Sequence, residues 1–236
     1  MSSFLIQIKT KFKQITGGIS ILYNEAKYVY KLDKKSLNRR NNSIMVTHYN
    51  DIKKVGVFVL VQTIPIIGWF PIFFAMIYPK QILTKHFWNE EEYNRFMKED
   101  YEERLKYGQN LNNYLQKRKI NIEKISIDSL HHEHLFHLAG ANQVCSNEIL
   151  LKIAPSIACQ AWLKTRASEI RKDDELLYVE GINDLTLREL QIANARRGLD
   201  PTTTDINVLK SQLQSWLLLK DERVNDSILL HSSATK

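Results

Sequence analysis

The sequence has few cysteines, glycines and prolines, and this scarcity excludes several classes of protein. Its 236 residues include two cysteines, Cys145 and Cys159, which form no Cys-x-x-Cys pair. A disulfide scaffold and a thiolate metal site are therefore excluded, and we expect both residues to be buried thiols. With eight glycines, five prolines, 44% hydrophobic residues and 25% charged residues, the chain is expected to fold around a sizeable core.

Motifs for catalysis and for phosphate or metal binding are also missing. There is no glycine-rich phosphate loop and no Gly-x-Ser-x-Gly elbow, and Asp173-Asp174 does not begin an EF-hand loop. Four histidines, His131, His132, His134 and His137, stand close together, but Phe136 occupies the position of the second histidine of His-Glu-x-x-His. We therefore predict neither an enzyme nor a metal or cofactor site, and we identify no small-molecule substrate.

Charge is distributed unevenly along the chain. Residues 1–54 hold 11 basic and 3 acidic residues, whereas residues 55–236 hold 22 basic and 23 acidic residues. A basic head on a nearly neutral body favours targeting or contact with a membrane surface over a surface that coats RNA.

A run of 25 residues without charge, residues 55–79, follows the basic head. As a helix rising about 1.5 Å per residue, it would exceed the ~30 Å hydrocarbon core of a bilayer. We predict one transmembrane helix here, within a segment 51–82, with a kink at Pro65, Gly68 and Pro71. The alternative is a buried hairpin of a soluble protein.

The first 50 residues are predicted to be a basic targeting or linker segment. Residues 1–24 contain three lysines and no acidic residue, and Phe4, Ile8, Phe12 and Ile15 can share one helical face. This pattern is typical of a mitochondrial transit peptide. A cytosolic amphipathic anchor is the competing interpretation.

The rest of the chain is predicted to be all-α. Apolar residues recur at intervals of three or four over 89–119, and shorter helices are indicated at about 128–139, 146–153 and 156–171. Asp173 and Asp174 are expected to cap a further short helix that ends at Gly181. A Thr186-x-x-Glu189 capping box starts another helix, which Gly198 ends, and Thr204 or Asp205 caps a last one. The helical domain is therefore placed at 85–220, and residues 221–236 are expected to be a tail.

Residues 173–199 carry a pattern that resembles a known family. These residues read Asp-Asp-x-Leu-Leu-x-x-Glu-Gly-Ile-x-x-Leu-Thr-x-x-Glu-Leu-x-x-Ala-x-x-Arg-Arg-Gly-Leu, and Trp216-Leu217 follows them. The pattern is similar to the matrix domain of the leucine-zipper and EF-hand-containing transmembrane (LETM) proteins of mitochondria. The segments 64–68 and 78–88 are similar to the span and its exit in the short LETM-domain subgroup, which lacks the EF-hand and the zipper. The resemblance covers about residues 52–220.

The resemblance implies a single-pass protein in the lipid of the mitochondrial inner membrane. Its helical domain would lie in the matrix, and would bind the mitochondrial ribosome or assembly partners in support of mitochondrial homeostasis. The larger relatives imply one alternative, a part in potassium or calcium exchange for protons. With no Asp, Glu, Lys, Arg or His between Val55 and Pro79, such transport would require a homo-oligomer. A second alternative is a SAP-like nucleic-acid module, because residues 185–199 share its helix-turn-helix spacing.

Contact with a ribosome should depend on basic side chains that neutralise phosphates. The candidate residues for binding the ribosome or a partner are Lys117, Arg118, Lys119, Arg166, Arg171, Lys172, Arg196 and Arg197. We expect reversal of Arg196 and Arg197 to glutamate to weaken ribosome binding without loss of helix. The competing interpretation is that these residues stabilise the C-termini of their helices.

The orientation of the predicted span stays open at the level of sequence. Lys53 and Lys54 precede the uncharged run, and Lys80 and Lys85 follow it. The positive-inside rule would keep the uncleaved basic head in the matrix, whereas the resemblance implies that the C-terminal domain lies there. Removal of a transit peptide would lessen this conflict.

Overall fold

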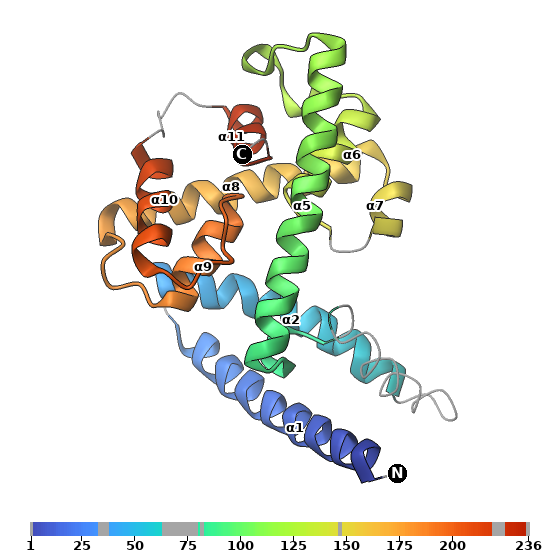
Figure 1. Cartoon of the computed structure of the whole chain (residues 1–236), viewed down its shortest axis with the longest axis vertical. Helices are drawn as coiled ribbons and strands as arrows, with labels where there is room; N and C mark the ends of the chain where they lie inside the picture. Colours follow the sequence, from blue (N-terminus) through green and yellow to red (C-terminus); the bar gives the residue numbers. More distant parts are fainter. Residues whose placement is uncertain are drawn as a thin grey trace. The chain divides into compact units, whose positions relative to one another are not determined.

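The fold is taken from a computed structural model, which describes residues 2–32, 38–62, 80, 83–145, 148–218 and 225–234 (Figure 1). Within these ranges every regular element is a helix, so the prediction of an all-α protein is confirmed. No helix in them combines the length and the apolar character needed to cross a bilayer. Most of the predicted span, with Pro65, Gly68 and Pro71, lies outside the described residues.

The chain folds as two units, Met1–Phe96 and Met97–Lys236. In the first unit, helix α1 (Ser2–Lys31) packs against helix α2 (Arg39–Gln62) and the short 3-10 helix η1 (Lys85–Phe87). The segment predicted to be a targeting head is thus helical and packed. Gly18 of α1 permits close approach to η1, because a side chain there would overlap the ring of Phe87.

Helix α5 (Glu90–Arg118) starts in the first unit and continues into the second. Its N-terminus is fixed locally, because the Glu92 amide donates to Asn89 Oδ1 at 2.7 Å and the Asn89 amide donates to Glu92 Oε2 at 3.1 Å. Acidic residues occupy its first turn and basic residues its last, as the helix macrodipole favours. The helix predicted at 89–119 is confirmed.

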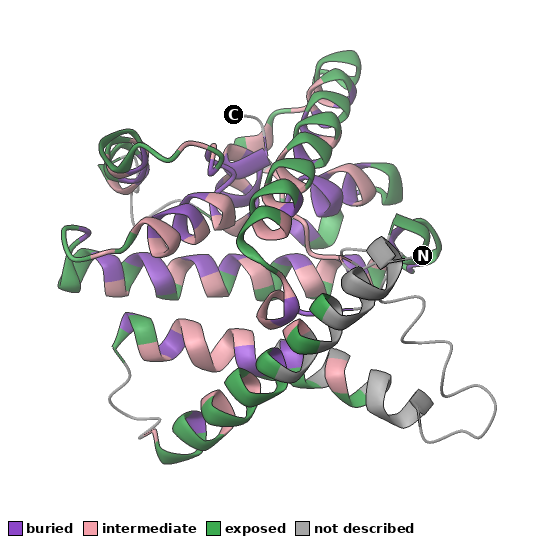
Figure 2. Cartoon of the chain, turned by 60° about the horizontal axis from the view of Figure 1, so that its bottom comes forward, coloured by how far each residue is buried: buried purple, intermediate pink, exposed green. Residues whose placement is uncertain are grey.

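The second unit is built around helix α8 (Ser156–Glu180). Helices α6 (His132–Ala141), α7 (Glu148–Ile153) and α11 (Asp226–Ala234) share one apolar core with α5 and α8. Helices α9 (Leu187–Arg196) and α10 (Ile206–Leu218) form a second core with Leu177 and Ile182. Two further 3-10 helices, η2 (Ile122–Lys124) and η3 (Ile127–Ser129), follow α5. Buried residues lie where the helices face one another (Figure 2).

Most of the predicted helix ends agree with the structure. Thr186 and Glu189 form a capping box at the start of α9, and Asp205 Oδ1 accepts the Asn207 amide at 2.8 Å at the start of α10. Gly181 and Gly198 have φ of 78° and 74°, positive values that glycine adopts without strain. One helix was misplaced. Asp173 and Asp174 do not cap a separate helix but lie inside α8, which runs on to Glu180.

Two other expectations about the second unit need correction. Residues 221–236 are not merely a tail, because α11 contributes Leu229, Leu230 and Ala234 to the core. The helical domain therefore extends beyond residue 220. Of the two cysteines, which are not joined in a disulfide, Cys159 is buried as expected, whereas Cys145 is half-buried.

The contact of α11 with the turn after α9 can be tested at two glycines of similar φ. A side chain at position 198 would overlap the Ser233 carbonyl and the Arg104 side chain, whereas one at position 181 would meet no atom. Gly181→Ala should lower the free energy of unfolding by about 1–3 kcal/mol, because φ of 78° with ψ of 176° is a conformation that is costly for alanine. Gly198→Ala should lower it by clearly more, as measured by urea unfolding of the full chain in detergent micelles. Equal losses would show that α11 does not pack on Gly198.

Candidate partner-binding site

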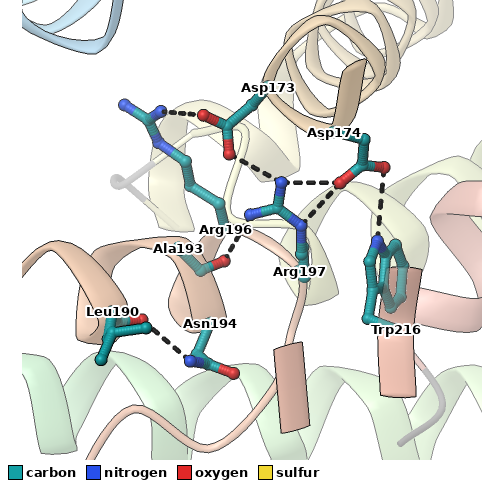
Figure 3. Close-up of polar contacts among 8 residues, drawn as sticks. All are labelled: Asp173, Asp174, Leu190, Ala193, Asn194, Arg196, Arg197 and Trp216. Atoms are coloured by element: carbon teal, nitrogen blue, oxygen red, sulfur yellow. Dashed lines mark hydrogen bonds and ion pairs between the residues drawn. The ribbon is translucent and has the colours of Figure 1, made fainter. Parts of the chain in front are cut away.

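A buried ion-pair network joins α8, α9 and α10 in the second unit (Figure 3). Asp173, Asp174 and Arg197 are each at most 1% exposed. Arg197 Nη2 donates to Asp173 Oδ2 at 2.7 Å and to Asp174 Oδ1 at 2.6 Å, and Arg197 Nε donates to Asp174 Oδ1 at 2.8 Å. Arg197 Nη1 donates to the Ala193 carbonyl at 2.8 Å, and Trp216 Nε1 donates to Asp174 Oδ2 at 3.3 Å. We call this group the Arg197 centre.

The burial of Arg197 corrects its predicted role as a direct contact. A side chain with no exposed surface, whose donors are used by two aspartates and a carbonyl, is inaccessible to a ribosome. The expectation that its reversal leaves the helices intact is also corrected, because glutamate would place a third carboxylate beside two buried ones.

Arg196 lies beside the Arg197 centre but reaches solvent. Its Nη1 is 3.9 Å from Asp173 Oδ1, and its side chain is 20% exposed. The first arginine of the pair is therefore partly exposed, while the second is fully buried.

Two more arginines stand close to this pair. The side chain of Arg166 in α8 is half-buried, and its Nη1 is 3.7 Å from Glu169 Oε2. Burial, and then the charge of Arg196, lower the pKa of Arg166 to about 10. Arg104 in α5 is 3% exposed, and burial followed by the charge of Arg166 lowers its pKa to about 9. Both stay protonated at neutral pH, so positive charge is crowded here.

Arg104 is held by main-chain oxygens from two helices. Its Nη1 donates to the Ala195 carbonyl at 2.7 Å, and its Nη2 donates to the Ser233 carbonyl at 3.0 Å. Arg104 was not among the predicted residues. A signal existed, because Arg104 follows Tyr101 by three residues and precedes Gly108 and Leu111 by four and seven, on the face that α5 buries. We call Arg104, Arg166, Arg196 and Arg197 the arginine cluster.

The other predicted basic residues lie in two further places. Arg171 Nε donates to Asp226 Oδ1 at 2.7 Å and so connects α8 to the start of α11, and the next residue, Lys172, is exposed. Lys117, Arg118 and Lys119 are exposed at the C-terminus of α5. They are separated from Arg104 along α5 by about 20 Å, given a rise of ~1.5 Å per residue. The structure therefore divides the candidate residues into separate groups.

The group at the end of α5 also has local structural roles. Arg118 Nη2 donates to Glu133 Oε2 at 3.2 Å, and the guanidinium carbon lies 4.8 Å from the centroid of the Tyr114 ring. Lys119 has φ of 52°, and the Ile120 amide donates to the Leu115 carbonyl at 3.1 Å, which closes the helix. These contacts agree with the competing interpretation as a helix C-terminus.

The histidine-rich segment contributes to the core rather than to a surface. His134 Nε2 lies 2.7 Å from His231 Nε2, and both rings are buried. His231 Nδ1 lies 2.6 Å from the Ser227 carbonyl, to which it donates, so its Nε2 accepts the proton of His134. Burial and the neighbouring His231 lower the pKa of His134 to about 4. Among the described residues, no group of three His, Cys, Asp or Glu side chains could hold a metal ion.

Comparison with protein families identifies the family to which a chain with these features belongs. The model of the family described as "LETM1-like, RBD" matches residues 37–155 and 115–236, which is more than half of the chain. The chain belongs to the LETM1-like, RBD family. The arginine cluster and the Arg197 centre both lie inside the matched residues.

One curated relative is the LETM1 domain-containing protein mdm28, mitochondrial, of Schizosaccharomyces pombe (strain 972 / ATCC 24843). It is 34% identical over 68 residues, which is 29% of this chain and 14% of that relative's length. The chain thus matches only a small part of this relative. No solved structure matches the chain.

The Arg197 centre should contribute strongly to the stability of the second unit, Met97–Lys236, which is called the LETM1-like unit below. Arg197→Met would leave two buried carboxylates without their counter-charge, so the free energy of unfolding should fall by about 3–5 kcal/mol. Arg196→Met, the matched control, removes a part-exposed pair and should change it by less than about 1 kcal/mol. Urea unfolding measures both, and comparable small losses would contradict the assigned role of Arg197.

The histidine pair should make stability depend on pH. Burial holds the pKa of His134 at about 4 and that of His231 below its ordinary value of 6.5, so the unfolded chain binds more protons between these limits. The free energy of unfolding should therefore fall as the pH drops from 6.5 towards 4, with His134 alone contributing on the order of 2 kcal/mol. His134→Gln should flatten this fall, whereas His132→Gln, at an exposed ring, should not. Equal slopes for the wild type and His134→Gln would contradict the effect.

Proposed function

We propose that this LETM1-like chain binds the mitochondrial ribosome through Arg166 and Arg196, the partly exposed members of the arginine cluster. The observation that carries the proposal is the gathering of four arginines at a partly exposed place, where burial and then the charge of a neighbouring arginine lower the pKa of Arg166 and of Arg104. The phosphates of ribosomal RNA, or the carboxylates of a ribosomal protein, would bring negative charge to this place.

The rigidity of the cluster supports its use as a binding site. Arg104 and Arg197 are fixed by carbonyl and carboxylate oxygens, so they hold positive charge behind Arg166 and Arg196 without reaching the surface themselves. A partner would then encounter charge that is already in place, which lowers the entropy lost on binding. Lys172, exposed on α8, is a further candidate contact.

We place this activity at the mitochondrial inner membrane. Two observations support the placement: the mitochondrial relative, and the uncharged run 55–79 that follows the basic head. In this proposal the run attaches the chain to lipid, and the LETM1-like unit faces the matrix, where ribosomes are. Cation exchange for protons stays an alternative, and the absence of ion flux through liposomes that hold the full chain would argue against it.

Ribosome binding can be tested by sedimentation of the full chain in detergent micelles with purified mitochondrial ribosomes over a salt series. Arg166→Gln/Arg196→Gln should weaken co-sedimentation and reduce the slope of log affinity against log salt by about 2, because two phosphate contacts are lost. The control Lys106→Gln/Lys152→Gln removes the same charge from exposed positions on α5 and α7 and should change binding little. Unchanged binding of the arginine variant at every salt concentration would contradict the proposal.

A further inference from the structure

Helix α1 of the first unit exposes a strip of large apolar side chains. Ile19, Tyr23 and Tyr30 are 55%, 69% and 92% exposed, and in Figure 2 their helix starts at the N label. They stand four and seven residues apart, so they lie along one side of the helix. A different side is packed, since Gln14 Nε2 donates to Glu92 Oε2 at 2.8 Å and Gly18 lies against Phe87. Exposed apolar side chains gathered in this way mark a site of interaction.

Positive charge lies beside this strip. Lys27 and Lys31 stand one turn apart on the neighbouring part of the helix surface, and both side chains are exposed. Glu25 is the one acidic residue in residues 1–32 of the sequence. It is half-buried, and its Oε2 atom lies 2.9 Å from His86 Nε2, so it is turned towards η1. The exposed side of α1 between residues 19 and 31 therefore combines apolar and tyrosine side chains with lysines.

An anionic lipid surface matches this combination. An isoleucine side chain enters the boundary of the acyl chains, a tyrosine lies at the level of the headgroups, and a lysine pairs with their phosphates. A wholly apolar partner would bury Lys27 without a counter-charge. A nucleic-acid backbone would bring negative charge but would leave Ile19 and Tyr23 in water. A lipid surface satisfies the apolar strip and the lysines together.

We propose that helix α1 lies on an anionic bilayer surface, with the strip of Ile19, Tyr23 and Tyr30 towards the lipid. This inference rests on the placement of the chain at a membrane proposed above. It adds a lipid contact that the folded first unit makes before the uncharged run begins. The basic head, interpreted from the sequence as a targeting or linker segment, then holds the first unit against the membrane.

Quenching of a fluorophore at single positions tests which side of α1 meets lipid. The full chain is made as Tyr23→Cys and, as the matched control, as Ile21→Cys, because both positions are exposed but lie about 200° apart around the helix. Each is labelled in micelles with a maleimide fluorophore, and the chain without an added cysteine gives the background from Cys145 and Cys159. The chains are reconstituted into liposomes of phosphatidylcholine and phosphatidylglycerol, with or without a lipid spin-labelled near its headgroup, and floated on a density gradient.

The spin label should quench emission at position 23 at least about twofold more than at position 21, because a residue of the strip reaches the headgroup layer. Equal quenching at the two positions, or stronger quenching at position 21, would overturn the inference while leaving attachment through the uncharged run intact. Failure of the chain to float with the liposomes would overturn both the attachment and the inference. Ribosome binding in micelles is measured separately and does not depend on either result.

The anionic character of the lipid is tested in the same assay by adding Lys27→Gln/Lys31→Gln to Tyr23→Cys. Loss of two lysines at the surface should weaken the contact about 30-fold, so quenching at position 23 should fall. Liposomes of phosphatidylcholine alone should lower it for the same reason. The matched pair Lys106→Gln/Lys152→Gln removes equal charge from exposed positions of the second unit and should leave quenching unchanged. A fall that is absent, or equal for the two pairs of substitutions, would overturn the assignment of an anionic lipid surface to α1.

Discussion

The buried Arg197 centre is the interaction on which the LETM1-like unit depends most. The guanidinium of Arg197 joins two adjacent carboxylates of α8. The indole of Trp216 in α10 donates a hydrogen bond to the remaining oxygen of Asp174. Three helices are thereby fixed in register by polar contacts that accept few alternative geometries. The apolar contacts of Leu177 with α9 and α10 then add burial to an arrangement that the ion pairs define. The positions of Arg166 and Arg196 at the surface follow from this arrangement.

Local signals in the sequence predicted most helix ends, because caps depend on residues only a few positions apart. Thr186 with Glu189 and the two glycines of positive φ act within one turn of the chain. The roles of Asp173, Asp174 and Arg197 could not be predicted from such local signals. Acidic and basic residues near helix ends have the same pattern whether they cap a helix or pair with each other in the interior. Burial of these three depends on a contact between positions more than 20 residues apart.

The membership of the candidate site could be predicted only in part. Basic residues were sought near the Arg-Arg-Gly motif, and the two partly exposed members of the arginine cluster come from helix α8 and the end of α9. One buried member, Arg104, comes from α5 and was not predicted. The orientation of the uncharged run shows a similar limit, because lysines stand on both sides of it in the sequence and so favour neither direction.

The place of α11 has a consequence for biosynthesis. Leu229, Leu230 and Ala234 close a core that otherwise consists of residues between 107 and 217, and Arg104 bonds to the carbonyl of Ser233. A nascent chain cannot complete this core until α11 has left the exit tunnel of the ribosome that makes it. Until then the long helices of the unit have emerged without their last partner, and the apolar surface that α11 covers is available to chaperones.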